Sequence, residues 1–170
     1  ETRIALFQQS CDIRQVNHAI RKKLPRVSFG FDWIKNGIND LYKNNISNYK
    51  LLITRNISED SLAAIDNNKT PKLEALCLLN GTIYLWNRPC YGVGNGVSHI
   101  RIENRYLPSG PSTIDEMANL AFWVGVMNGM PDEAKKIWNK VDFVDASSNF
   151  TKAARYGLSS QMDWFGESLS

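Results

Sequence analysis

The segment HIRIENRY at residues 99–106 constrains the fold more than any other stretch of the chain. In an extended strand, successive side chains point to opposite faces. One face of this strand therefore carries four ionisable side chains: His99, Arg101, Glu103 and Arg105. We call these four residues the charged row. A carboxylate between two guanidiniums, at steps of about 7 Å along one surface, suits a polyanion and a metal ion.

A second interpretation of the charged row is an ordinary strand surface in water, with Glu103 neutralised by neighbouring arginines. The flanking sequence favours a site. Residues 107–112, LPSGPS, form a turn rich in proline and serine, and a well-signalled helix start follows them. Loops between a strand and a helix commonly carry binding residues, so we take the row as the candidate site.

The sequence just upstream predicts a partner strand for the row. Residues 82–88 have strand composition and end at Pro89, and residues 90–97 contain three glycines at alternate positions. These glycines lack the helix-opening context of a Rossmann or P-loop motif, so we interpret them as a hairpin connection. Strand 82–88 would then lie antiparallel to strand 98–106, which brings Asn87 and Arg88 near the charged row.

Apolar periodicity and capping signals predict helices at residues 31–53, 59–65, 70–79, 113–129, 131–139 and 147–156. The expected N-terminal caps of the first three are Asp32, Ser58 and Thr70. The fourth opens with a capping box, TIDE, that starts at Thr113. Its expected inner stripe is Ile114, Met117, Ala118, Ala121, Val124 and Met127. The last helix is expected to end at Gly157.

Composition favours one globular domain over residues 1–170, of the α+β class, with an antiparallel sheet flanked by helices. A chain of 170 residues with 43% hydrophobic content can bury one core. The net charge of +3 lacks the concentration typical of a nucleic-acid binder, so we expect no nucleic-acid partner. Because the sequence shows no long apolar run and no leader, we expect a cytoplasmic protein without a membrane partner.

Two further groups of residues are interpreted structurally. Three cysteines without close paired spacing, Cys11, Cys77 and Cys90, predict buried free thiols instead of disulfides or a zinc site. The most basic segment predicts a solvated helix face in preference to an anion site; it contains Arg14, His18, Arg21, Lys22, Lys23 and Arg26.

Four motifs occur in order: WNRP at 86–89, HIRIENR at 99–105, PSGP at 108–111 and DEMAN at 115–119. Together they resemble the carboxylate-amine ligase branch of the glutamate–cysteine ligase family, most strongly over residues 82–129. The strand with Glu103 and Arg105, followed by an aspartate and an Ala-Asn pair, also resembles part of the related glutamine synthetase catalytic fold. The resemblance implies a partial glutamine-synthetase-like domain.

The resemblance implies ATP- and magnesium-dependent amide formation, in which a substrate carboxylate attacks the γ-phosphate and an amine captures the acyl phosphate. Glu103 would bind Mg²⁺, and Arg105 would hold the ATP phosphates. Arg88 would assist in nucleotide binding, and Arg101 and His99 would offset charge during phosphoryl transfer. The substrates would be glutamate or a similar amino acid and an amine; a homo-oligomer is left open.

One departure from the family limits these expectations. Family members collect several acidic metal ligands from N-terminal strands, and no acidic cluster precedes residue 59 here. We therefore expect a C-terminal piece of a longer ligase, inactive by itself and holding one wall of the site. The alternative is a non-catalytic nucleotide- or anion-binding module that uses the basic segment together with Arg88, Arg101 and Arg105. A structural fragment with an inert charged strand is the third possibility.

Overall fold

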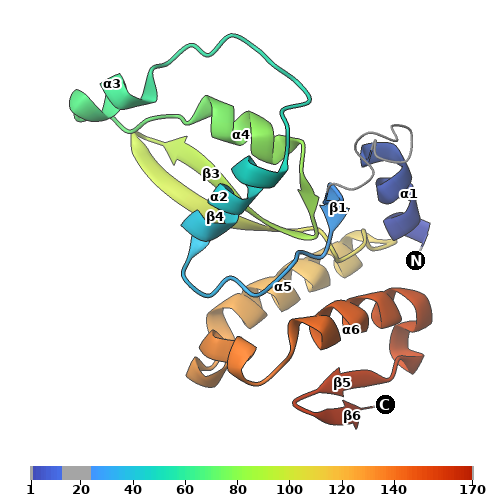
Figure 1. The fold of residues 1–170 in the computed structure, drawn as a ribbon. Helices are drawn as coiled ribbons and strands as arrows, with labels where there is room; N and C mark the ends of the chain where they lie inside the picture. The colour runs from blue at the N-terminus through green and yellow to red at the C-terminus, as the bar shows by residue number, and fades with distance from the viewer. Residues whose placement is uncertain (1, 13–23, 170) are drawn as a thin grey trace. The chain divides into compact units, whose positions relative to one another are not determined.

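The computed structural model describes residues 2–12 and 24–169 (Figure 1). Helices alternate with three two-stranded sheets, which confirms the α+β class. The chain separates into two compact units. We call the first, residues 2–30 and 36–105, the hairpin unit, and the second, residues 31–35 and 106–170, the helical unit. A single domain over the whole chain stays a prediction.

The hairpin unit takes its name from two antiparallel strands, β3 (Asn87–Gly94) and β4 (Val97–Asn104). The turn between them is Asn95-Gly96, with φ angles of 51° and 77°. An Asn-Gly pair with two positive φ angles is the preferred two-residue connection of a hairpin. Strand β4 agrees with the prediction. The predicted glycine-rich loop at 90–97 is wrong, because residues 90–94 continue β3 and only two residues turn.

The predicted strand at 82–88 is divided. Tyr84 and Leu85 form the short strand β2 (Tyr84–Leu85), which pairs in parallel with β1 (Val27–Ser28), and the following residues start β3. Pro89 is tolerated inside β3 because its only partner strand among the described residues is β4, and proline is compatible with an open strand edge.

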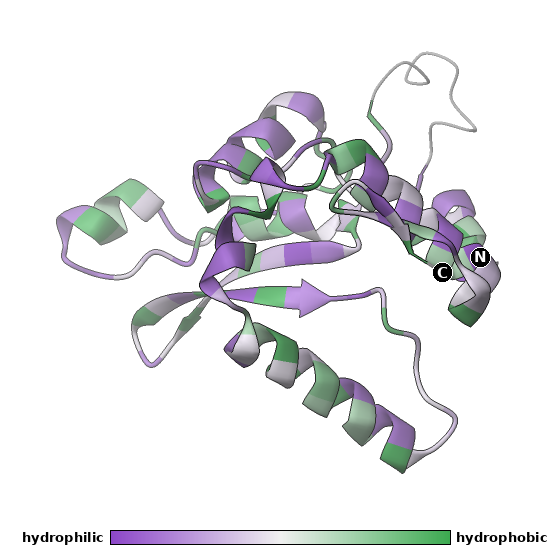
Figure 2. Cartoon of the chain, turned by 90° about the horizontal axis from the view of Figure 1, so that it is seen from below, coloured by the Kyte–Doolittle hydropathy of each residue, from purple (hydrophilic) through white to green (hydrophobic). Residues whose placement is uncertain are grey.

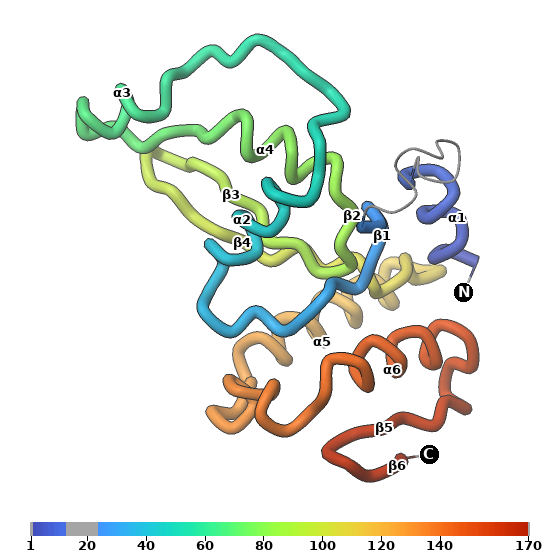
Figure 3. Tube along the Cα trace, in the orientation of Figure 1, coloured from blue at the N-terminus to red at the C-terminus, as the bar shows by residue number. Residues whose placement is uncertain are grey.

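Four helices complete the hairpin unit: α1 (Thr2–Cys11), α2 (Ile38–Asn48), α3 (Ser61–Asp66) and α4 (Glu74–Gly81). Between α2 and α3 the chain runs through residues 49–60 without helix or strand (Figure 3). The core consists of one cluster, to which α4 and β2 both contribute: Tyr49, Leu79, Ile83 and Leu85. This cluster buries Leu79 of α4, and Asn80 of the same helix donates through Nδ2 to Pro89 O of β3 at 2.9 Å.

The predicted helix at 31–53 is wrong outside α2. Gly37, with φ of 102°, precedes α2 in a conformation that no helix allows. Asp32 does not cap it; its carboxylate accepts a hydrogen bond from the Trp33 amide at 2.7 Å. Residues 31–35 belong instead to the helical unit, where Trp33 Nε1 donates to Val141 O at 2.9 Å and the indole meets Phe143 edge-on. Tertiary contacts override the apolar periodicity here.

Two predicted caps are also replaced. Asp60 caps α3 by accepting from the Leu62 amide at 2.9 Å, while Ser58 donates to Glu74 at 2.6 Å. Helix α4 begins only at Glu74, and Thr70 instead donates to Gly96 O in the hairpin turn.

The helical unit contains α5 (Thr113–Gly129), the 3-10 helix η3 (Asp132–Asn139), α6 (Phe143–Tyr156), the 3-10 turn η4 (Gly157–Ser159) and two short strands, β5 (Met162–Trp164) and β6 (Glu167–Leu169). Gly157 follows α6 as predicted. The capping box of α5 uses Ser112 and Asp115, one residue earlier than the TIDE assignment. The terminal hairpin was not predicted.

Helix α5 is the best-predicted helix, but its predicted inner stripe is wrong for the described chain. None of its residues is buried, and Ile114 and Met117 are 81% and 58% exposed. Figure 2 shows apolar residues repeated along its whole length. The periodicity and the capping signals predicted the helix correctly, because capping and propensity are local properties. They did not predict that its apolar side chains are exposed in the described chain.

The cysteines of the described chain are free thiols, as predicted, but only Cys90 is buried. No helix among residues 2–12 and 24–169 combines the length and apolar character needed to cross a membrane. Of the basic segment, Arg14, His18, Arg21, Lys22 and Lys23 lie outside the described residues.

Arg26 was predicted to lie on a solvated face, and this is wrong. It is only 6% exposed. Its guanidinium donates to Thr82 O and Oγ1 at 3.2 and 3.1 Å and to Lys50 O, and lies 5.4 Å from the Tyr49 ring centre. The side chain thus ties three segments of the hairpin unit together.

We expect Arg26→Leu to lower the free energy of unfolding by about 2–3 kcal/mol, because it removes three hydrogen bonds of a buried guanidinium and leaves two partly buried carbonyl groups without this donor. Urea unfolding followed by circular dichroism measures the change. Arg55→Leu is the control, because Arg55 is 58% exposed and its ion pair with Glu74 spans 3.7 Å; it should cost less than about 1 kcal/mol. Equal losses in both variants would contradict the structural role of Arg26.

Candidate functional site

The register of the hairpin assembles the candidate site. Arg88 lies opposite Glu103, Cys90 opposite Arg101, and Gly92 opposite His99. Since alternate residues share a face, these six residues occupy one face of the hairpin. The predicted proximity of Arg88 to the charged row is confirmed, and Asn87 lies opposite Asn104 beside it.

One part of this face is a closed ion cluster around Glu103. Arg88 Nε and Nη2 donate to Glu103 Oε2 at 3.1 and 2.7 Å, and Arg105 Nη2 lies 3.0 Å from Oε1. Arg88 Nη1 also donates to Asn80 O at 2.9 Å. Arg105 lies over the Tyr84 ring, 4.3 Å from its centre. Glu103 is therefore neutralised by arginines, as the second interpretation of the charged row predicted.

The ion cluster controls the pKa of Glu103. Partial burial by itself raises the pKa of this carboxyl, but hydrogen bonds and Coulomb attraction from Arg88 and Arg105 outweigh burial and lower the pKa below its ordinary value. Glu103 therefore stays ionised at neutral pH.

The other part of the face is open. His99 and Arg101 reach across the hairpin over Gly92, where a Cβ atom would lie 2.8 Å from His99 Nε2 and 3.3 Å from Arg101 Nη1. The absence of a side chain at this position is what lets both groups lie there. Among the described residues, no carboxylate lies within ion-pair distance of Arg101. Arg101 is thus the cation of the row that remains available to an external anion.

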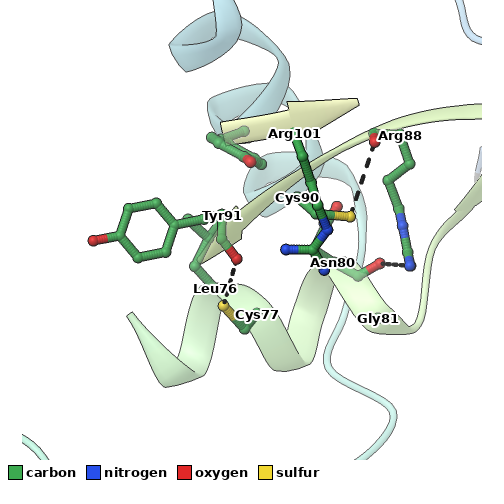
Figure 4. A pocket seen from close by; sticks show the side chains of 9 residues that line it. Leu76, Cys77, Asn80, Gly81, Arg88, Cys90, Tyr91 and Arg101 are labelled. Carbon is green, nitrogen blue, oxygen red and sulfur yellow. Dashed lines mark hydrogen bonds between the residues drawn. The ribbon is translucent and has the colours of Figure 1, made fainter. Parts of the chain in front are cut away.

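A cavity of about 140 Å³ lies beside this face, between α4 and the hairpin (Figure 4). Its lining combines two guanidiniums, two thiols, a carboxamide and phenol groups: Tyr42, Leu76, Cys77, Asn80, Gly81, Arg88, Cys90, Tyr91 and Arg101. Burial raises the pKa of Tyr42 and of Cys77, so both are neutral near pH 7. No aspartate or glutamate of residues 2–12 and 24–169 lines the cavity.

Sequence reasoning missed the α2 and α4 residues of this cavity, including Tyr42, Cys77 and Asn80. Tyr42 falls in the predicted helix at 31–53 and Cys77 in the predicted helix at 70–79, whereas Asn80 follows the latter in an Asn-Gly pair that predicts a turn. Asn80 gives a weak signal of a specific role, because a carboxamide at the apolar end of a helix needs hydrogen-bond partners if it is buried. It is 7% exposed, and its Nδ2 donates to Pro89 O at 2.9 Å.

A magnesium site is not complete in the described chain. No group of three or more histidine, cysteine, aspartate or glutamate side chains is close enough there to hold a metal ion. Glu103 is a single carboxylate, and both of its oxygens contact guanidiniums. The residues present therefore do not fit Mg²⁺ by themselves.

Comparison of the chain with protein-family models, curated proteins and solved structures gives no match. The resemblance to carboxylate-amine ligases therefore stays a prediction.

The first prediction for the site concerns Gly92. We expect Gly92→Ala to displace the His99 and Arg101 side chains, because the new Cβ overlaps their ends, while stability changes by less than about 1 kcal/mol. The chemical shifts of the His99 ring and the Arg101 guanidinium in NMR spectra measure the displacement.

Gly94→Ala is the matched control in the same strand. A Cβ there meets His99 Cε1 at 3.9 Å, an ordinary contact, so the His99 ring signals should stay unchanged. Similar shifts in both variants would show that the close approach over Gly92 is not what holds the two side chains.

The second prediction concerns pH. Because the folded-state pKa of Glu103 lies below its ordinary value of 4.5, its stabilising contribution is complete above about pH 4.5 and is lost as pH falls through the lowered pKa. The stability difference between wild type and Glu103→Gln, measured by urea unfolding, should shrink as the pH is lowered below 4.5. A difference that does not vary with pH would contradict the ion cluster.

Proposed function

We propose that this chain supplies one wall of the active site of an ATP- and magnesium-dependent carboxylate-amine ligase of the glutamate–cysteine ligase family. The observation that carries the proposal is the convergence of Arg88, Arg101 and Arg105 with Glu103 on one hairpin face. Two of the motifs that suggest the family, WNRP and HIRIENR, are separate in sequence but lie side by side in the hairpin.

The arrangement suits phosphoryl transfer. Planar guanidiniums bind phosphate oxygens through two parallel hydrogen bonds. Arg88 and Arg105, which pair with Glu103 in this structure, would exchange part of that pairing for the ATP phosphates. Arg101 and His99 lie on the same face and would offset the negative charge that develops during transfer from ATP to the substrate carboxylate. Bound magnesium would supply further charge neutralisation at the phosphates.

Glu103 remains our candidate magnesium ligand, together with acidic groups that the described residues do not provide. A two-stranded hairpin is marginal as an independent sheet. Its second face exposes Ile100 and Ile102, at 46% and 41%. Both features fit a larger antiparallel sheet of the glutamine synthetase type, of which this chain would hold the C-terminal part. The substrates proposed are glutamate or a similar amino acid and an amine.

The test uses the parent protein that contains this chain. We expect it to release ADP from Mg-ATP in the presence of glutamate and an amine, measured by a coupled ADP assay. Glu103→Gln should lower turnover on the order of 100-fold or more, with the same fold by circular dichroism. Nucleotide binding without ADP release, for every amine offered, would refute the ligase proposal; unchanged turnover of Glu103→Gln would refute the metal assignment.

The second candidate is a non-catalytic nucleotide- or anion-binding module. The observation that favours it is the pairing of Glu103 with two arginines, which leaves Arg101 as an anion contact without an accompanying metal ligand. Binding by phosphate contacts alone should weaken steeply with salt and need no magnesium. Titration of ATP with and without Mg²⁺ separates the two candidates.

A further inference from the structure

We propose that the cavity between α4 and the hairpin binds a small oxyanion that carries its own hydrogen-bond donor, such as hydrogen phosphate or the carboxylate end of an α-amino acid. The site would need neither magnesium nor a nucleotide. The inference goes beyond the proposed function and holds whether or not the chain belongs to a ligase.

The charge of the lining selects an anion. Among the residues that the structure describes, two arginines and no acidic residue line the cavity. Arg88 is already committed to Glu103 and to Asn80 O. Arg101 is not paired with a carboxylate among the described residues, so its guanidinium can bind an oxyanion through two hydrogen bonds. The Glu103 carboxylate accepts from Cys90 Sγ at 3.4 Å and is paired with Arg88 and Arg105.

The Asn80 side chain favours a ligand that carries a hydrogen-bond donor. Because Pro89 O can only accept, the Asn80 carboxamide must turn Nδ2 toward it, as observed at 2.9 Å. Oδ1 is then buried, with almost no accessible surface, and lacks a hydrogen-bond partner in the described part of the chain. A buried acceptor without a partner is unfavourable, so a ligand whose O–H or N–H group draws Oδ1 to the cavity surface would remove that penalty.

The remaining lining limits the size of the ligand. The cavity volume of about 140 Å³ is well below the roughly 300–1,000 Å³ of pockets for drug-sized ligands. A nucleotide does not fit inside it, whereas a tetrahedral oxyanion or a small amino acid does. The Tyr42 hydroxyl at the cavity wall donates its hydrogen to Pro89 O at 3.4 Å, so it can only accept from a ligand.

The experiment is a calorimetric and NMR titration of the full chain near pH 7, without magnesium, at constant ionic strength. Inorganic phosphate and sulfate form one pair of probes, and glycine and acetate the other. In each pair only the first member carries a donor beside its oxyanion. We expect the first member of at least one pair to bind tenfold or more tightly than the second. The pair that shows the difference identifies the source as a phosphate or an amino acid.

Variants place the binding in the cavity. Arg101→Gln should weaken it at least tenfold, and Gly92→Ala should weaken it while Gly94→Ala does not. Arg55→Gln removes an exposed arginine outside the cavity lining and should change affinity less than threefold.

Three results would overturn the proposal. They are an absence of binding by all four probes, equal affinities within both pairs, and full affinity in Arg101→Gln.

Discussion

The site depends on the pairing of Arg88 with Glu103 across the β3–β4 hairpin. This ion pair joins two strands at 2.7 Å, and its arginine also reaches the carbonyl of Asn80 at the end of α4. One guanidinium therefore fixes the strand register, the carboxylate of the charged row and the position of α4 together. A shift of the register by one residue would turn every charged side chain to the other face and remove the cavity.

The ion pair also divides the charged row by function. Glu103 forms ion pairs with Arg88 and Arg105, so these three residues together carry a net charge of about +1, and the ion pairs hold their side chains in place. Arg101 and His99 lie over Gly92 outside this cluster, where the Arg101 charge and the hydrogen-bonding groups of both side chains are open to a ligand. A preorganised cluster next to an open cation is an arrangement suited to binding anions, since little reorganisation is needed when the ligand arrives.

The sequence predicted those features that depend on local chemistry. Alternation over residues 99–106 identified strand β4 and the face shared by the charged row, and capping signals located α5 to within one residue. It failed where a distant contact decided the outcome. Trp33 lies outside any helix because its indole bonds to Val141 O, and Arg26 is buried because two distant segments, at Lys50 and at Thr82, surround it with acceptors. The cavity combines α2, α4 and the hairpin, whose proximity no local pattern encodes.

The sequence by itself thus determined that the four residues of the charged row share one face, because the period of a strand is two. Only the tertiary structure decided how that row is used. It paired Glu103 with two arginines, left Arg101 open above a glycine, and placed the buried carboxamide of Asn80 beside it. The physical reason is that the contacts of a charged side chain decide whether it can bind a ligand, and those contacts depend on the packing of segments distant in sequence.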